Sequence, residues 1–129
     1  MDNISISATE RSPEVHFDFA NNQLKLKGES YPEDVAAFYG PLVAALDRWL
    51  SSLSQGSVVF DIELVYFNSS SAKALMNILM LLEKAGNAGN TVVINWRYSA
   101  DDDTMQEFGE DFAEDLESVT FNLCAVEAA

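Results

Sequence analysis

Apolar and polar side chains alternate in the first part of the chain, which predicts strands. In residues 14–19 (EVHFDF) and again in residues 23–27 (QLKLK), every second side chain is apolar, the period of a half-buried strand. The Asn-Asn pair between them is a turn signal, because asparagine tolerates left-handed backbone angles. The pattern predicts a β-hairpin that ends at Gly28. Residues 4–8 alternate more weakly and predict an edge strand.

Helical periodicity follows this hairpin. Apolar residues recur at spacings of three and four over residues 32–53, which predicts an amphipathic helix. Ser30 with Glu33 three residues later matches a capping box at its start. Pro41 lies inside the segment, and we expect it to kink or split the helix because proline removes one backbone hydrogen bond.

Strands and helices alternate in the rest of the chain. Residues 57–67, 91–98 and 119–126 are rich in β-branched and aromatic residues and predict strands, whereas residues 69–85 and the acidic residues 101–117 predict helices. A strand, a helix and a strand at these lengths form a βαβ unit, which requires parallel strands and a right-handed crossover. The chain is therefore expected to be α/β: a mixed sheet in which an N-terminal β-hairpin is followed by alternating helices and strands.

Composition and charge narrow the possible functions. The 129 residues are 48% hydrophobic and 22% charged, so we expect one folded domain over residues 1–129. The formal net charge of −14 argues against nucleic acid and anionic membrane surfaces as partners. With one cysteine (Cys124) and one histidine (His16), neither an internal disulfide nor a Cys/His zinc site can form. We expect no metal and no cofactor. The absence of a signal-peptide pattern and of a long apolar run predicts a cytoplasmic protein.

The segment 66–73 (YFNSSSAK) is the most informative for function. It lies where the predicted central strand ends and a helix begins, and functional groups of open α/β sheets gather at such strand ends. Asn68 or Ser69 can cap the helix. A phosphate on Ser69 would be stabilised by the helix N-terminus, and Lys73 lies four residues later on the same helix face. Simple helix capping is the competing interpretation.

Several blocks together resemble the SiaC family of bacterial regulatory phosphoproteins. The matching blocks are Gly28-Glu29-Ser30-Tyr31-Pro32-Glu33-Asp34, Tyr66-Phe67-Asn68-Ser69-Ser70-Ser71-Ala72-Lys73, Trp96 with Tyr98, Asp101-Asp102-Asp103 and Gly109-Glu110-Asp111. The resemblance implies a STAS-like (SpoIIAA-like) fold and a non-enzymatic phosphorylation switch. It also implies three partners: a dedicated protein kinase, a PP2C-type phosphatase, and a diguanylate cyclase that the unmodified form activates, promoting cyclic-di-GMP synthesis and biofilm formation.

The resemblance also implies which residue carries the phosphate. The modified hydroxyl of the family directly follows the asparagine of the Tyr-Phe-Asn block, which is Ser69 here, with the neighbouring Ser70 and Ser71 as alternates. The family's well-known example has threonine at this position. Tyr66 and Phe67 are expected to support the site from the strand end.

Two further surfaces are candidates for partner binding. Met76 and Met80 lie beside a polar stripe of the helix after the motif, and methionines form adaptable docking surfaces; a helix covered on two sides would show the same pattern. The acidic triplet Asp101, Asp102 and Asp103 begins the acidic helix, whose charge we interpret mainly as a solvated face and alternatively as a docking face for a basic partner.

Two other functions are alternatives to the switch. A STAS-like module could sense a small ligand at the same strand end without phosphorylation. A small hydrolase or transferase is the least supported, because the chain has no GxSxG, Walker or dinucleotide-binding motif.

Overall fold

The computed structural model describes residues 1–127 and contains one six-stranded sheet with three helices. The strands lie in the sheet in sequence order, from β1 to β6. In chain order the elements are β1 (Ile4–Ile6), β2 (Glu14–Asp18), β3 (Gln23–Ser30), α1 (Val35–Ser52), β4 (Ser57–Phe67), α2 (Ser69–Asn87), β5 (Thr91–Ser99), α3 (Asp103–Glu114) and β6 (Thr120–Val126).

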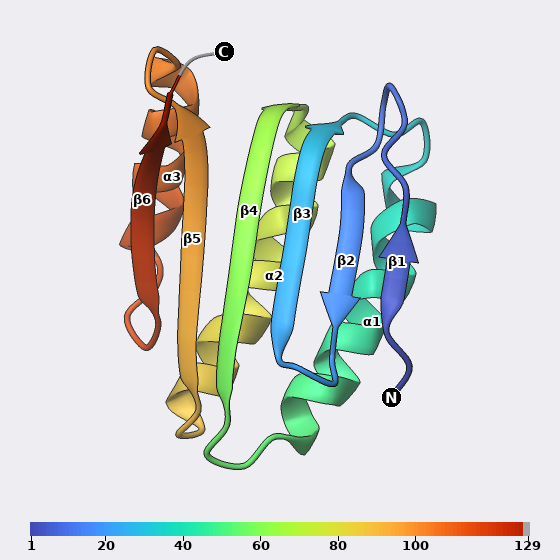
Figure 1. Cartoon of the computed structure of the whole chain (residues 1–129), viewed down its shortest axis with the longest axis vertical. Coiled ribbons are helices and arrows are strands. Elements are labelled where there is room, and N and C mark those ends of the chain that lie inside the picture. Colours follow the sequence, from blue (N-terminus) through green and yellow to red (C-terminus); the bar gives the residue numbers. More distant parts are fainter. Residues whose placement is uncertain (128–129) are drawn as a thin grey trace.

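The predicted mixed α/β architecture is confirmed. β1, β2 and β3 are antiparallel to one another, whereas β3, β4, β5 and β6 are parallel. Each parallel connection passes through one helix, and all three connections advance in the same direction across the sheet. Because such crossovers are right-handed, they place every helix on the same face. Figure 1 shows α1, α2 and α3 behind the sheet, which leaves its front face open.

The hydrophobic core lies between this helical layer and the sheet. Alternate side chains of the strands, such as Leu26, Phe60 and Ile94, are fully buried against Leu46 of α1 and Leu79 of α2. Full burial of one such side chain stabilises the fold by about 1.5–3 kcal/mol. The intervening side chains of the strands point to the open face and are mostly polar, which explains the alternating pattern of the sequence.

The start of α1 differs from the predicted capping box. Ser30 is the last residue of β3, and its side chain is fully buried. The helix cap is Asp34, whose carboxylate accepts a hydrogen bond from Ala37 N at 3.0 Å. Pro41 does not split the helix, because α1 is continuous from Val35 to Ser52. The residue before it, Gly40, has no Cβ to collide with the proline ring.

Gly28 does not end β3. The strand continues to Ser30 through a register shift at Gly28 and Glu29, where the partner of β3 changes from Leu64 to Tyr66. Gly28 has a φ of +124°, which only glycine adopts readily. The irregularity leaves Val65 as an extra residue of β4, as in a β-bulge.

The remaining helices differ from the prediction at their ends. α2 extends two residues further than the predicted residue 85, and α3 covers Asp103–Glu114 rather than residues 101–117. Asp102 caps α3 by accepting a hydrogen bond from Met105 N at 3.0 Å. The helix therefore starts at the third residue of the acidic triplet, Asp103.

Candidate functional site

The predicted site lies at the carboxyl ends of β3 and β4, where α2 begins. Asn68 connects these three elements. Its backbone N–H donates to Ser30 O at 3.1 Å, and its backbone carbonyl accepts from Ala72 N at 2.9 Å. Its side-chain Oδ1 accepts from Ser71 N at 2.9 Å. Asn68 is therefore the N-cap of α2, and it fixes the first turn of the helix relative to the end of β3.

The three consecutive serines have different environments. Ser69 and Ser70 are exposed in the first turn of α2, whereas the side chain of Ser71 is fully buried. Ser71 Oγ accepts a hydrogen bond from Ser30 Oγ at 2.9 Å. A hydroxyl with no exposed surface cannot enter a kinase active site in this conformation, so only Ser69 and Ser70 are accessible acceptors here.

A chain of buried hydroxyls lies directly beneath this turn. Ser30 Oγ donates to Ser71 and lies 2.5 Å from Tyr39 Oη, so the Tyr39 hydroxyl donates to Ser30. The chain joins α1, β3 and α2 through side chains that are all buried. Burial raises the pKa of the Tyr39 hydroxyl above its ordinary value of 10.0, and the nearby Ser30 hydroxyl, which can also donate to a phenolate, opposes part of this shift.

Removing the Tyr39 hydroxyl tests this chain. We expect Tyr39→Phe to lower the free energy of unfolding by about 1 kcal/mol near neutral pH, because one buried hydrogen bond is lost. The wild-type protein holds the tyrosine proton more tightly when folded than when unfolded. The contribution of the Tyr39 hydroxyl to the free energy of unfolding is therefore complete below pH 10.0, and it is lost as the pH rises through the pKa of the folded state.

The deficit of Tyr39→Phe should accordingly shrink in alkaline solution. Urea unfolding of both proteins near neutral pH and at about pH 11 measures this difference. Ser70→Ala, at an exposed position of the same helix turn, is the control and should unfold like the wild type. An equal deficit at both pH values would contradict the assignment.

Tyr66 and Phe67 lie on opposite faces of β4. Phe67 is buried, and its ring centroid lies 4.7 Å from that of Phe108 and 6.2 Å from that of Trp96. Tyr66 is half exposed and packs edge-on against Tyr31, with 5.7 Å between the two ring centroids. Phe67 thus packs in the core against β5 and α3, whereas Tyr66 contributes an exposed aromatic ring on the other face. Their support of the phosphorylation site stays a prediction.

An open groove of about 420 Å³ separates the first turns of α1 and α2. Val35, Tyr39 and Val43 of α1 line it on one side, and Ser70 and Lys73 line it on the other. The groove is largely apolar, and Lys73 is a cation at its rim. Neither of the two ion pairs among residues 1–127 includes Lys73.

The acidic triplet follows β5 at the same edge of the sheet, because β4 and β5 are parallel. Asp102 is the cap of α3, and Asp101 Oδ1 accepts a hydrogen bond from Ser99 Oγ at 2.7 Å. Asp103 is exposed. No group of three or more histidine, cysteine, aspartate or glutamate side chains within residues 1–127 could hold a metal ion.

Comparison with known proteins identifies the family. A family model described as "SiaC family regulatory phosphoprotein" matches residues 6–126 of the chain. The chain belongs to the SiaC family. A relative from Pseudomonas aeruginosa strain UCBPP-PA14 is 34% identical over 115 residues, which are 89% of this chain and 90% of the relative.

Solved structures of SiaC have the same fold. SiaC of Pseudomonas aeruginosa superposes with a TM-score of 0.89 at 32% identity, covering 98% of this chain and 100% of that one. A crystal structure of the diguanylate cyclase SiaD in complex with its activator SiaC, from the same organism, contains a chain with a TM-score of 0.89 at 33% identity, covering 95% of this chain and 99% of that one.

The blocks that resemble the SiaC family fall into two structural groups. Those around Ser30, Asn68 and Asp102 form the carboxyl edge of the parallel strands. Gly109 instead packs α3 closely on β5, because a Cβ added there would lie 2.5 Å from Cδ1 of Trp96. The sequence motif therefore combines a surface site with the close packing that positions it.

Other predicted surface residues of this SiaC-family chain lie along α2. Met80 is exposed and Met76 is half-buried, on the side of the helix that also carries Lys73. Both residues are therefore accessible to a partner, and their role in binding stays a prediction. No helix within residues 1–127 is long and apolar enough to cross a membrane.

Proposed function

We propose that this chain is a binding protein that reversible phosphorylation of Ser69 switches between partners. In this proposal the unmodified form binds and activates a diguanylate cyclase, and so promotes cyclic-di-GMP synthesis and biofilm formation. A protein kinase adds the phosphate and a PP2C-type phosphatase removes it. The membership of the SiaC family supports this, together with the complex in which SiaC of Pseudomonas aeruginosa is the activator of SiaD.

The observation that carries the assignment of Ser69 is its place on the molecule. It is the first residue of α2, it is exposed, and it directly follows the Asn68 cap. The helix N-terminus carries about half a positive charge, which favours an anion at this position. Lys73 lies one turn later on the same helix face. The burial of Ser71 argues against it as the acceptor, which leaves Ser70 as the better alternate.

Phosphorylation should change what docks on α2 and leave the core unchanged. No side-chain hydrogen bond within residues 1–127 involves the Ser69 hydroxyl, so its modification breaks no internal contact. The phosphate adds about −1.5 to −2 charges to a chain whose formal net charge is already −14. This concentrated negative charge lies in the first turn of α2, next to Ser70 and one turn before Lys73, which both line the apolar groove. A partner that binds the neutral form at this turn would meet the charge.

We also propose that the chain itself catalyses no reaction. The polar side chains at the strand end are engaged in building the helix start: Asn68 and Asp102 are caps, and Ser30 and Ser71 are buried in hydrogen bonds. None of them is held against a nucleophile or a general base in the arrangement that covalent or acid–base catalysis requires.

Phosphopeptide mapping of the protein from its own host tests the assignment. We expect phosphate on Ser69, in an amount that rises when the PP2C-type phosphatase is deleted. Ser69→Ala should abolish the modification, whereas Ser70→Ala, the matched control, should retain it. Phosphate that persists in Ser69→Ala but is lost in Ser70→Ala would move the switch to Ser70, and no phosphate under any growth condition would contradict the proposal.

The groove between α1 and α2 favours a second candidate function, a module that senses a small ligand. Its volume of about 420 Å³ and its apolar lining, with Lys73 at the rim, would suit a small amphipathic anion. A metabolite that raises the melting temperature of Ser69→Ala would support this function, because ligand binding stabilises the folded state by mass action. Lys73→Ala should then lose the shift.

A further inference from the structure

β6 forms one edge of the sheet, and half of its backbone groups point outward. β6 pairs in parallel with β5, and Val126 O accepts a hydrogen bond from Ala100 N at 2.8 Å. Strand pairing uses every second residue of an edge strand. The backbone N–H and C=O groups of Phe121, Leu123 and Ala125 therefore point away from β5. No other strand within residues 1–127 pairs with them.

This edge lacks the features that usually prevent pairing with another chain. Proteins protect sheet edges with short strands, charged residues, prolines or bulges. The opposite edge follows this rule, because β1 has only three residues. β6 has seven residues, TFNLCAV, without a charge or a proline, and its register with β5 is regular. The strand is suited to accept a further strand.

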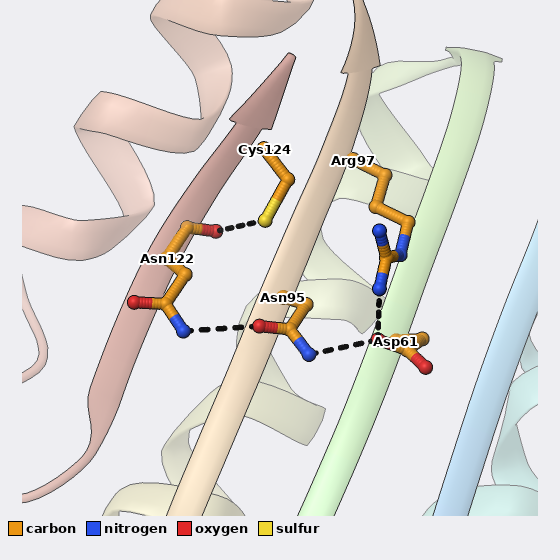
Figure 2. Close-up of polar contacts among 5 residues, drawn as sticks. All are labelled: Asp61, Asn95, Arg97, Asn122 and Cys124. Carbon is orange, nitrogen blue, oxygen red and sulfur yellow. Dashed lines mark hydrogen bonds and ion pairs between the residues drawn. The ribbon is translucent and has the colours of Figure 1, made fainter. Parts of the chain in front are cut away.

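A ladder of side chains crosses the open face of the sheet and ends at this edge (Figure 2). Asn122 Nδ2 donates to Asn95 Oδ1 at 3.0 Å, and Asn95 Nδ2 donates to Asp61 Oδ1 at 2.9 Å. Arg97 also donates to Asp61 Oδ1, at 3.3 Å. All the amide donors point inward, toward β4. The ladder ends at the side-chain amide of Asn122, whose Oδ1 receives no hydrogen bond from residues 1–127.

The charge beside the edge indicates which kind of strand would fit. α3 lies behind β5 and β6 in Figure 1. Its exposed side chains include Glu107, Glu110, Asp111 and Glu114. Both ion pairs found within residues 1–127 are elsewhere, on the open face of the sheet. The flank of the edge is therefore strongly negative, and it would attract a cationic segment.

A second copy of this chain is a poorer occupant. Pairing of two β6 strands would extend the sheet through a two-fold axis and bring two acidic α3 helices to the same region. Like charges placed opposite one another across an interface cost several kcal/mol. This repulsion favours a partner that brings positive charge.

We propose that the free edge of β6 binds an extended, lysine- or arginine-bearing segment of a partner protein by strand addition. The partner's backbone pairs with Phe121, Leu123 and Ala125. A donor side chain of the partner completes the ladder at Asn122, and its cations face α3. This edge lies two strands from β4, at whose end Ser69 stands, so the surface is separate from the proposed phosphorylation site.

A synthetic peptide of alternating lysine and asparagine residues, long enough to span β6, is the probe. Because successive side chains of a strand point to opposite faces, it can bring cations toward α3 and amide donors toward Asn122. We titrate it into the isotope-labelled full chain and follow the backbone amides by NMR. We expect saturable shifts along Thr120–Val126 and slower hydrogen exchange at the outward amides of Phe121, Leu123 and Ala125. The same peptide with an N-methylated backbone keeps its charge but cannot pair as a strand. Its affinity should be lower by a factor of about ten or more.

Two variants at one position separate strand pairing from simple charge attraction. Ala125→Pro removes one outward N–H and no bond to β5, a replacement that edge strands tolerate. Ala125→Val keeps the N–H and is the matched control. We expect the proline variant to bind the peptide about tenfold more weakly and the valine variant to bind it like the wild type. Ser69→Glu should bind it unchanged.

Three results would overturn the proposal. The first is no saturable binding of the peptide to the wild-type chain. The second is equal binding of the N-methylated peptide, which would show attraction to α3 without strand pairing. This second comparison remains decisive if Ala125→Pro unfolds. The third is a concentration-dependent dimer of the free chain in sedimentation velocity that Asn122→Leu abolishes, which would assign the edge to a second copy.

Discussion

Gly86→Ala is expected to lower the free energy of unfolding by about 3 kcal/mol, although alanine is the better helix former. A Cβ on Gly86 of α2 would lie 2.2 Å from the backbone carbonyl oxygen of Ser118 and 3.1 Å from its Cβ. Atoms do not approach so closely, and the oxygen belongs to the main chain. The loop before β6 or the end of α2 must therefore move.

Glu83 makes this movement costly. Its buried carboxylate accepts hydrogen bonds from Ser118 N at 2.8 Å and from Glu117 N at 3.0 Å. Ser118 also donates from its hydroxyl to Asn87 Oδ1. A shift of the loop large enough to accommodate a methyl group would stretch these charge-assisted bonds, each of which contributes about 1.5–3 kcal/mol.

Equilibrium unfolding in urea measures the loss, with Gly56→Ala as the control. The nearest atoms to a Cβ on Gly56 are 3.5 Å away, an ordinary contact, so the same exchange should be neutral or stabilise the fold by up to about 1 kcal/mol. An unchanged urea midpoint for Gly86→Ala would mean that the loop between α3 and β6 adapts freely, contrary to the role assigned to Glu83.

The arrangement of the sheet was predictable because burial on one face leaves a clear trace in the sequence. β4 is predicted at its observed bounds, Ser57–Phe67, since Val58, Phe60, Ile62 and Leu64 are buried at every second position. The parallel strands followed from the helices that separate them. Neither inference depended on details of packing.

Local irregularities could not be predicted from the same pattern. Continued alternation after Leu64 would place Tyr66 in the core and Phe67 on the open face. The extra residue in β4, opposite Gly28, reverses this and turns Phe67 inward. A bulge depends on the pairing of two strands that are distant in the sequence. The buried position of Ser30 could not be predicted for a related reason, because a serine three residues before a glutamate is also a helix-cap signal.

Helical periodicity in the sequence could have distinguished the buried serine from the two exposed ones. Ser71, Leu75, Ile78 and Leu82 follow one another at spacings of four, three and four, and all four are fully buried. The spacing places Ser71 on the core stripe of α2 and leaves Ser69 and Ser70 outside it. The polar partners that make this burial tolerable, Ser30 and Tyr39, come from other elements and required the structure.

Phosphorylation of Ser69 is expected to weaken binding to the diguanylate cyclase about a hundredfold, which corresponds to about 2.7 kcal/mol. This rests on the proposed function. A phosphate on Ser69 adds about −1.5 to −2 charges at the start of α2, one residue before Ser70, which lines the apolar groove. If the cyclase covers this surface, the phosphate must lose its bound water. Lys73 is the cation that this chain offers on the same face of the helix, and no second cation there, among residues 1–127, compensates for the loss.

Calorimetric titration of the purified cyclase with the unmodified and the enzymatically phosphorylated chain measures the effect. Ser69→Ala should bind like the unmodified protein, and Ser69→Glu, which carries less charge than a phosphate, should give an intermediate loss. Ser70→Glu is the matched control for charge: it adds the same carboxylate one residue along the helix. Stimulation of cyclic-di-GMP synthesis should follow the same order as affinity.

The position of the charge decides how the result is interpreted. A loss for Ser69→Glu that exceeds the loss for Ser70→Glu would place position 69 closer to the bound cyclase. Equal losses would indicate long-range repulsion from a chain that already carries a formal net charge of −14, and raised salt should then remove most of them, because exposed charges are screened over about 10 Å. Equal affinity of the phosphorylated and unmodified chains would contradict the switch itself.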